Sequence, residues 1–124
     1  MITLLTCALT LLGSPWPVAL DVSGTGDHRH PVPGEIQVLH WTVRNEEARR
    51  LDRVRLWVRP PADWGRPVER ELGSLAPGTA RRVTLRFTVP AHPRYGRFRI
   101  TGRTWDGEVA GPSAGWWVTV VRHR

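Results

Sequence analysis

The chain has no lysine and a single cysteine, Cys7, among its 124 residues. One thiol cannot form an intramolecular disulfide or supply the cysteine ligands of a structural zinc site, so neither device is expected to support the fold. A chain of this length buries roughly two thirds of its unfolded surface without such support. We therefore expect the stability of the protein to come from one hydrophobic core.

Because lysine is absent, arginine carries every side-chain positive charge apart from histidine, and the net charge is +7. Guanidinium groups stack on aromatic rings and bind carboxylates or phosphates through two parallel hydrogen bonds, which ammonium groups do not. The basic balance permits an anionic partner, such as an acidic glycan, a cell-wall polymer, a lipid headgroup or a nucleic acid. It does not choose among these classes.

Residues 1–19 contain no charged side chain at all. Their apolar stretch, Ile2–Leu12, has the length of the hydrophobic region of a signal peptide, and prolines then end any helix. The stretch is too short to span a bilayer, which requires about 20 apolar residues. We expect a signal peptide over residues 1–19 and an exported domain over residues 20–124, so that Cys7 leaves with the leader. The alternative is a buried N-terminal strand in a cytosolic protein.

After residue 20 no stretch has a helical period of apolar residues. Runs of alternating apolar and polar residues, of which Leu51–Arg59 is the clearest, are instead separated by turn signals such as Pro33-Gly34-Glu35 and Pro77-Gly78. This pattern of strands and turns predicts an all-β fold: a single immunoglobulin-like β-sandwich of about seven antiparallel strands. The expected strands are residues 20–23, 36–44, 51–59, 68–72 at an edge, 82–89, 97–105 and 116–122.

The same alternation assigns the inner face of the sandwich. In three separate strands the apolar residues recur at every second position, so their side chains point to one face and meet between two packed sheets. Trp41 is expected in the core, and Trp64 is expected to anchor a loop. The residues expected to form the shared core are Val54, Leu56, Leu85, Phe87, Phe98 and Ile100.

Residues 30–104 resemble a known bacterial family. The similarity lies in the segments PVPGEIQVLHWTVRNEE, LDRVRLWVRPPADWG, LGSLAPGTARRVTLRFTVP and YGRFRI. The group comprises the immunoglobulin-like domain found beside carbohydrate-binding modules in secreted alpha-galactosidases (the NPCBM-associated domain) and the related CARDB-type cell-adhesion domains. This chain departs from the pattern at Glu46-Glu47, where a small residue or glycine usually follows the asparagine. The resemblance implies an exported, non-catalytic accessory or adhesion module, and it carries over no binding residues.

One motif matches a catalytic signature. Gly111-Pro112-Ser113-Ala114-Gly115 fits the G-x-S-x-G nucleophile elbow, which requires a strand before the serine and a helix after it. Here a strand-like segment follows, and no carboxylate lies downstream to orient His123. We interpret the motif as a loop that enters the last strand.

Other chemistry-bearing residues also favour structural roles. His28-Arg29-His30 lacks a third metal ligand at useful spacing and is interpreted as a solvated loop. Glu69 and Glu71 share a strand face, and Asp106 and Glu108 flank a turn; ion pairs with the many arginines are their expected use, because glycoside hydrolysis needs a substrate cleft. We predict no catalytic residue, no metal site and no cofactor.

The seven tryptophans are the one compositional excess. In an immunoglobulin-like order the third strand pairs with the sixth and the sixth with the seventh, which places guanidinium and indole groups on one outer face. We expect Trp57 beside Arg97 and Arg99, and Trp105 opposite Trp116 or Trp117. The candidate binding face consists of Arg53, Arg55, Trp57, Arg59, Arg97, Arg99, Arg103, Trp105 and Trp117.

Two interpretations of this face are open. It can be a flat platform on which sugar rings stack while arginines hold acidic groups. It can also be a structural ladder of stacked tryptophan and arginine, in which each exposed cation–π pair contributes about 0.5–1 kcal/mol.

Taken together, these patterns favour a non-catalytic accessory or adhesion module of the secreted fraction, the periplasm or the cell envelope. One alternative is a carbohydrate-binding module that uses the Arg/Trp face. Another is a structural partner protein that adds its edge strand to another sheet. The expected partner is a glycan, an acidic envelope polymer or another envelope protein, and the expected export argues against nucleic acid.

Overall fold

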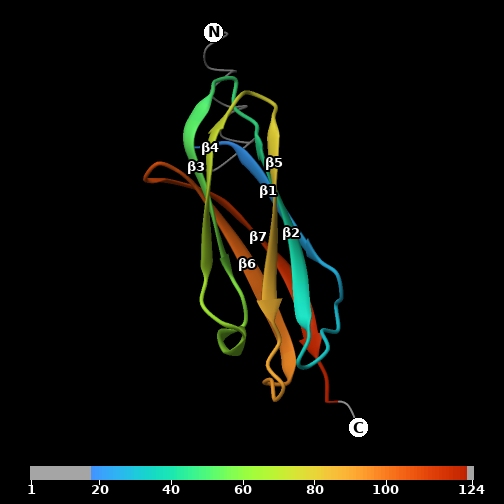
Figure 1. Ribbon diagram of the computed structural model, residues 1–124. Helices are drawn as coiled ribbons and strands as arrows, with labels where there is room; N and C mark the ends of the chain where they lie inside the picture. The colour runs from blue at the N-terminus through green and yellow to red at the C-terminus, as the bar shows by residue number, and fades with distance from the viewer. Residues whose placement is uncertain (1–17, 123–124) are drawn as a thin grey trace.

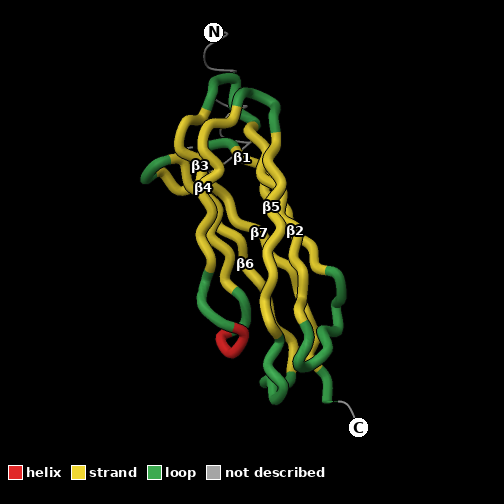
Figure 2. The backbone as a smooth tube through the Cα atoms, viewed as in Figure 1, coloured by secondary structure: helices red, strands yellow, loops and turns green. Residues whose placement is uncertain are grey.

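The computed structural model describes residues 18–122, which fold into seven strands and one short 3-10 turn, η1 (Ala62–Trp64). Within this part of the chain η1 is the only helical element (Figure 2). The all-β prediction is therefore confirmed. The strands are β1 (Leu20–Gly26), β2 (Ile36–Asn45), β3 (Leu51–Arg59), β4 (Val68–Leu75), β5 (Ala80–Thr88), β6 (Gly96–Asp106) and β7 (Val109–Val120).

The strands form two packed antiparallel sheets with the orders β1-β2-β5 and β4-β3-β6-β7 (Figure 1). The predicted pairs of third with sixth and sixth with seventh strand are confirmed. β4 pairs with β3, whereas a constant-type immunoglobulin domain keeps its fourth strand with the first, second and fifth. β1 lies along β7, and the backbone N–H of Thr119 donates to the carbonyl oxygen of Arg29 at 2.8 Å, which closes that side of the sandwich.

The last strand is much longer than the sequence suggests. Gly107 adopts a positive φ of 60°, so the chain turns tightly and Asp106 pairs directly with Val109. The small residues that follow were interpreted as a loop, and this is wrong: Ser113 and Gly115 pair with β6 across the sheet. Pro112, which has no N–H to donate, coincides with the register shift between Arg103 and Trp105.

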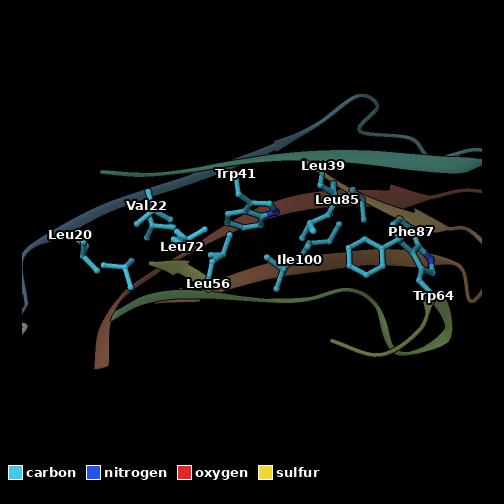
Figure 3. Close-up of a cluster of buried hydrophobic side chains, with 14 of the residues drawn as sticks. Leu20, Val22, Leu39, Trp41, Leu56, Trp64, Leu72, Leu85, Phe87 and Ile100 are labelled. Atoms are coloured by element: carbon cyan, nitrogen blue, oxygen red, sulfur yellow. The ribbon is translucent and has the colours of Figure 1, made fainter. Parts of the chain in front are cut away.

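The core is centred on Trp41, whose side chain is fully buried between the two sheets (Figure 3). Its ring lies directly on Gly24 of the neighbouring β1 and on Gly102 of the opposite sheet, where any larger residue would collide with it. The predicted shared core is confirmed, except that Phe98 is only half-buried. Trp64, 6% exposed, anchors the β3–β4 loop in the core as predicted.

Asn45, at the end of β2, is the polar centre of one end of the sandwich and is 0% exposed. Its side-chain amide donates to the carbonyl oxygens of Arg49 and Leu75, each at 2.9 Å, and its Oδ1 accepts from the N–H of Glu47 at 2.7 Å. The backbone of Asn45 is also bonded to Thr79. One side chain thus joins the β2–β3 turn to the end of β4.

The predicted leader meets the sandwich at its last two residues, while residues 1–17, with Cys7, lie outside the described residues. Val18 is 2% exposed and belongs to the core. The N–H of Ala19 donates to Oε1 of Glu47, and its carbonyl accepts from the N–H of Glu46, both at 3.1 Å. Across residues 18–122 no helix is long and apolar enough to cross a membrane.

Candidate binding face

The outer face of the four-stranded sheet carries the interleaved indole and guanidinium groups that the sequence predicts. Arg55 is the cross-strand partner of Trp105, and Trp57 is the partner of Arg103. The guanidinium of Arg103 lies 5.9 Å from the ring centroid of Trp57 and 5.2 Å from that of Trp105, and Arg55 lies 5.5 Å from Trp105. We call these four residues the Arg/Trp ladder.

Neighbouring acidic and carbonyl groups hold the ladder in place. Arg55 donates from Nη1 to Oε1 of Glu69 on β4 and from Nη2 to the carbonyl oxygen of Gly107, each at 2.7 Å. The backbone N–H of Arg53 donates to Oδ1 of Asp106 at 3.1 Å. The prediction that Glu69 forms an ion pair with an arginine is confirmed. In the ladder, therefore, fixed partners already occupy one donor on each terminal nitrogen of Arg55.

The opposite end of β6 and β7 carries a second group, Arg97, Arg99 and Trp117, which we call the basic end. The guanidinium of Arg97 lies 4.2 Å from the ring centroid of Trp117, and Arg99 pairs with Trp117 across the strands and lies over Gly115. Both arginines are exposed, and Trp117 is 47% exposed. No carboxylate of the described residues lies within 4.0 Å of either guanidinium.

Two predicted neighbours on this face are wrong. Trp57 does not lie beside Arg97 and Arg99, because β3 ends with Arg59 opposite Thr101, so the first residues of β6 extend beyond it. Trp105 faces Ala110 and not a tryptophan, because the tight β6–β7 turn pairs the last residues of β6 with the first residues of β7. Arg59 lies on the same face at the end of β3 and is exposed.

Sequence reasoning missed two further stacked pairs. Arg122 lies 5.3 Å from the ring centroid of Tyr95, the only tyrosine, and this pair extends the basic end beyond both strands. Arg29 lies 5.4 Å from the ring of Trp116, on the side where β1 approaches β7. Tyr95 and Arg29 lie outside the expected strands, and alternation along a strand is the only sequence signal that assigns a side chain to a face.

The structure shows where the sequence motifs with catalytic or metal-binding potential lie. Ser113 lies inside β7, with a strand on both sides of it, so the strand–turn–helix geometry of a nucleophile elbow is not formed. His28 and His30 lie exposed between β1 and β2. Among residues 18–122 no three His, Cys, Asp or Glu side chains are grouped so as to hold a metal ion.

The edge of β5 that faces away from β2 is relevant to the alternative function, in which the protein adds an edge strand to the sheet of another protein. Asn45 and Val89 fix the hydrogen-bonded pairs between β2 and β5, so the alternate residues Arg82, Thr84 and Arg86 direct their backbone groups away from β2. Charged side chains on an edge strand are a common protection against unwanted pairing. Strand addition therefore stays a prediction.

We expect Trp57→Ala to lower the free energy of unfolding by roughly 1–2 kcal/mol, because it removes a half-buried indole and its stacking on Arg103. Denaturant unfolding of the variant and of wild type measures the difference. A midpoint identical to that of wild type would show that the ladder adds nothing to the fold.

The sheet orders and the packed core define the class of the protein: an immunoglobulin-like β-sandwich domain. More particularly, the chain belongs to the family of the NPCBM-associated, NEW3 domain of alpha-galactosidase, whose sequence profile matches residues 32–104. The family is an accessory domain associated with glycoside hydrolases, and the resemblance inferred from the sequence is confirmed. No curated protein matches the chain in sequence.

Solved structures of similar fold come from unrelated contexts. The alkylpurine DNA glycosylase AlkC of Pseudomonas fluorescens, bound to DNA containing an abasic site analog, is 16% identical with a TM-score of 0.53, over 94% of this chain and 34% of that one. The sporulation control protein Spo0M of Bacillus subtilis is 18% identical with a TM-score of 0.54, over 85% and 50%. A beta-glucosidase from Erythrobacter marinus is 16% identical with a TM-score of 0.51, over 84% and 16%. The chain spans half or less of each, and the likeness shows the fold alone.

Proposed function

We propose that this domain is a non-catalytic accessory or adhesion module of the secreted fraction or cell envelope, and that it attaches to carbohydrate through the outer face of β3, β6 and β7. The observation that carries the proposal is the outer sheet surface on which indole and guanidinium groups interleave. Aromatic rings offer flat apolar area, and guanidinium groups offer several hydrogen-bond donors to hydroxyl or acidic groups.

Two further observations support this proposal. The family profile ties the chain to a domain of alpha-galactosidase, a carbohydrate-active enzyme. The described surface, residues 18–122, is not hollowed into a pocket, so a ligand on this face would lie along an open strand surface. Such a surface suits an extended polymer better than a small molecule, because small ligands are bound in concave sites that bury most of their area.

The test is a binding measurement with the full chain on polysaccharides of different charge. Native gels cast with polygalacturonate, which is acidic, or with neutral galactan are expected to retard the protein in at least one case, while no reducing sugar is released. If the protein migrates alike in gels with and without each polymer, carbohydrate attachment is wrong.

Export of the domain is part of the same proposal. The uncharged apolar residues 1–17 support a leader. A cut after Ala19 would remove Val18 from the core and the hydrogen bond from Ala19 to Glu47, so we place the cleavage before Val18. Mass spectrometry of the protein from its native host is expected to find this shortened N-terminus outside the cytoplasm. An intact Met1 in the cytoplasmic fraction would contradict export.

A further inference from the structure

We infer that the outer face divides into two parts with different roles: the Arg/Trp ladder stabilises the sheet, and the basic end binds a carboxylate-bearing polysaccharide. This inference rests on the proposed attachment to carbohydrate and adds the location of the site and the charge of the ligand. Both parts lie on the same sheet and share strand β6, while the ladder also includes β3 and the basic end also includes β7 (Figure 1). They differ in that Arg55 of the ladder is ion-paired with Glu69, whereas neither arginine of the basic end has a carboxylate of the described residues within 4.0 Å.

Within the strands of this sheet, acidic residues lie only toward the ladder. Glu69 and Glu71 on β4, and Asp106 and Glu108 at the β6–β7 turn, surround the ladder. None of the 11 acidic residues of the chain lies within residues 96–105 or 109–122, which form the rest of the two strands. Among the described residues Arg55 is paired with Glu69, whereas Arg97, Arg99 and Arg103 have no carboxylate within 4.0 Å. Asp63 of the β3–β4 loop reaches the basic end, but its Oδ2 accepts from the backbone N–H of Arg94 at 2.8 Å.

The stacking of Arg97 on Trp117 leaves its hydrogen-bonding edge open. The guanidinium carbon of Arg97 lies over the indole, 4.2 Å from the ring centroid, and no carboxylate of the described residues lies within 4.0 Å of its N–H groups, which lie in the plane of the guanidinium. Those in-plane donors match the two oxygens of a carboxylate. Arg99 lies over Gly115, where the absence of a side chain leaves room for it next to Trp117. Two preorganised guanidinium groups therefore flank one half-exposed aromatic ring.

The site continues along the strand ends. Tyr95 is 45% exposed and carries Arg122 at 5.3 Å from its ring centroid. Arg99 lies four positions after Tyr95 in the chain, which corresponds to about 13 Å in an extended strand. A single acidic monosaccharide cannot contact all these groups at once, so the geometry fits a polymer with repeated carboxylates. Each repeated contact adds affinity through the raised effective concentration of the next acidic group.

The experiment compares two double variants that change the net charge equally. Arg97→Gln with Arg99→Gln removes the basic end, and Arg82→Gln with Arg86→Gln removes two arginines of β5 in the other sheet. Titration of the full chain with polygalacturonate is expected to show binding that is weakened roughly tenfold or more in the first variant and within about twofold of wild type in the second. Binding by wild type should also weaken as salt is raised from about 50 to about 300 mM, because the charges are exposed. Thermal melting of both variants at about the temperature of wild type shows that neither has lost its fold.

Each contrary outcome has its own meaning. Equal loss in both double variants would mean that net charge, not the basic end, attracts the polymer, and the inference would be wrong. Equal wild-type binding to neutral galactan and to polygalacturonate would overturn the acidic ligand but leave carbohydrate attachment standing. Tighter binding to single-stranded DNA than to polygalacturonate at the same salt would assign the basic end to nucleic acid. Absence of binding to any polysaccharide would overturn the proposed function itself, and this inference with it.

Discussion

Replacing Trp41 with alanine is expected to lower the free energy of unfolding by about 3–5 kcal/mol, the range typical of a large buried side chain removed from a core. Trp41 is 0% exposed and touches both sheets, so the surrounding residues cannot close the cavity without moving one sheet toward the other. Since a domain of this size has a stability of roughly 5–15 kcal/mol, the loss is a large share of the whole. Urea unfolding monitored by circular dichroism measures it.

A double-mutant cycle tests the contact between Trp41 and Gly102 directly. Gly102→Ala alone should cost about 1–3 kcal/mol, because the added methyl group meets the indole. In a Trp41→Leu background the same methyl group should cost much less, which gives a coupling energy of about 0.5–3 kcal/mol. Additive penalties would contradict the placement of the ring between the two strands.

Asn45→Ala is the second large expected effect, a loss of roughly 2–4 kcal/mol. The substitution deprives two carbonyl oxygens, of Arg49 and Leu75, of their donor and deprives the N–H of Glu47 of its acceptor. Each buried group left without a partner costs about 1–3 kcal/mol, partly offset where water reaches the turn. Gln37→Leu is a suitable control, because Gln37 is also buried but its amide makes only one such bond, to the carbonyl oxygen of His28.

Asn45→Asp gives this prediction a pH dependence. The introduced carboxyl would face two carbonyl oxygens in a buried site, which disfavours its charged form and raises its pKa above the ordinary value. The folded state then binds the proton more tightly than the unfolded state, so the stability of the variant falls as pH rises from about 4 to about 7. The difference in stability between the variant and wild type should therefore grow over this range. A constant difference would show that the amide donors of Asn45 are not essential.

The strand pattern of the sequence was enough to predict the fold class and the core. Val54, Leu56, Leu85 and Phe87 are buried as their spacing requires, because a residue two positions away always lies on the same face of a strand. Prediction of strand ends was less successful. The segment around Pro112 and Gly115 has the composition of a loop, yet it pairs with β6, since neighbouring strands can supply hydrogen bonds that local propensity does not favour.

The candidate face was predicted correctly as a set of outward residues but not as a set of neighbours. Alternation along a strand fixes which face a side chain takes, and it placed Trp57, Arg103 and Trp105 together on one face as found. Register between strands depends on where each turn closes and how far each strand extends. Those lengths determined that Arg103, and not Arg97, lies beside Trp57.

By itself the sequence determined an all-β sandwich with its inner and outer faces. The alternation of apolar and polar residues along a strand assigns each side chain to a face, whichever strand lies next to it. Only the tertiary structure decided which charges are neutralised. Glu69 meets Arg55 because β4 pairs with β3, while Arg97 and Arg99 extend past the end of β3, where no carboxylate of the described residues lies within 4.0 Å of their guanidinium groups. Coulomb interactions depend on distance in space, and residues far apart in the chain acquire that distance only when the sheets have formed.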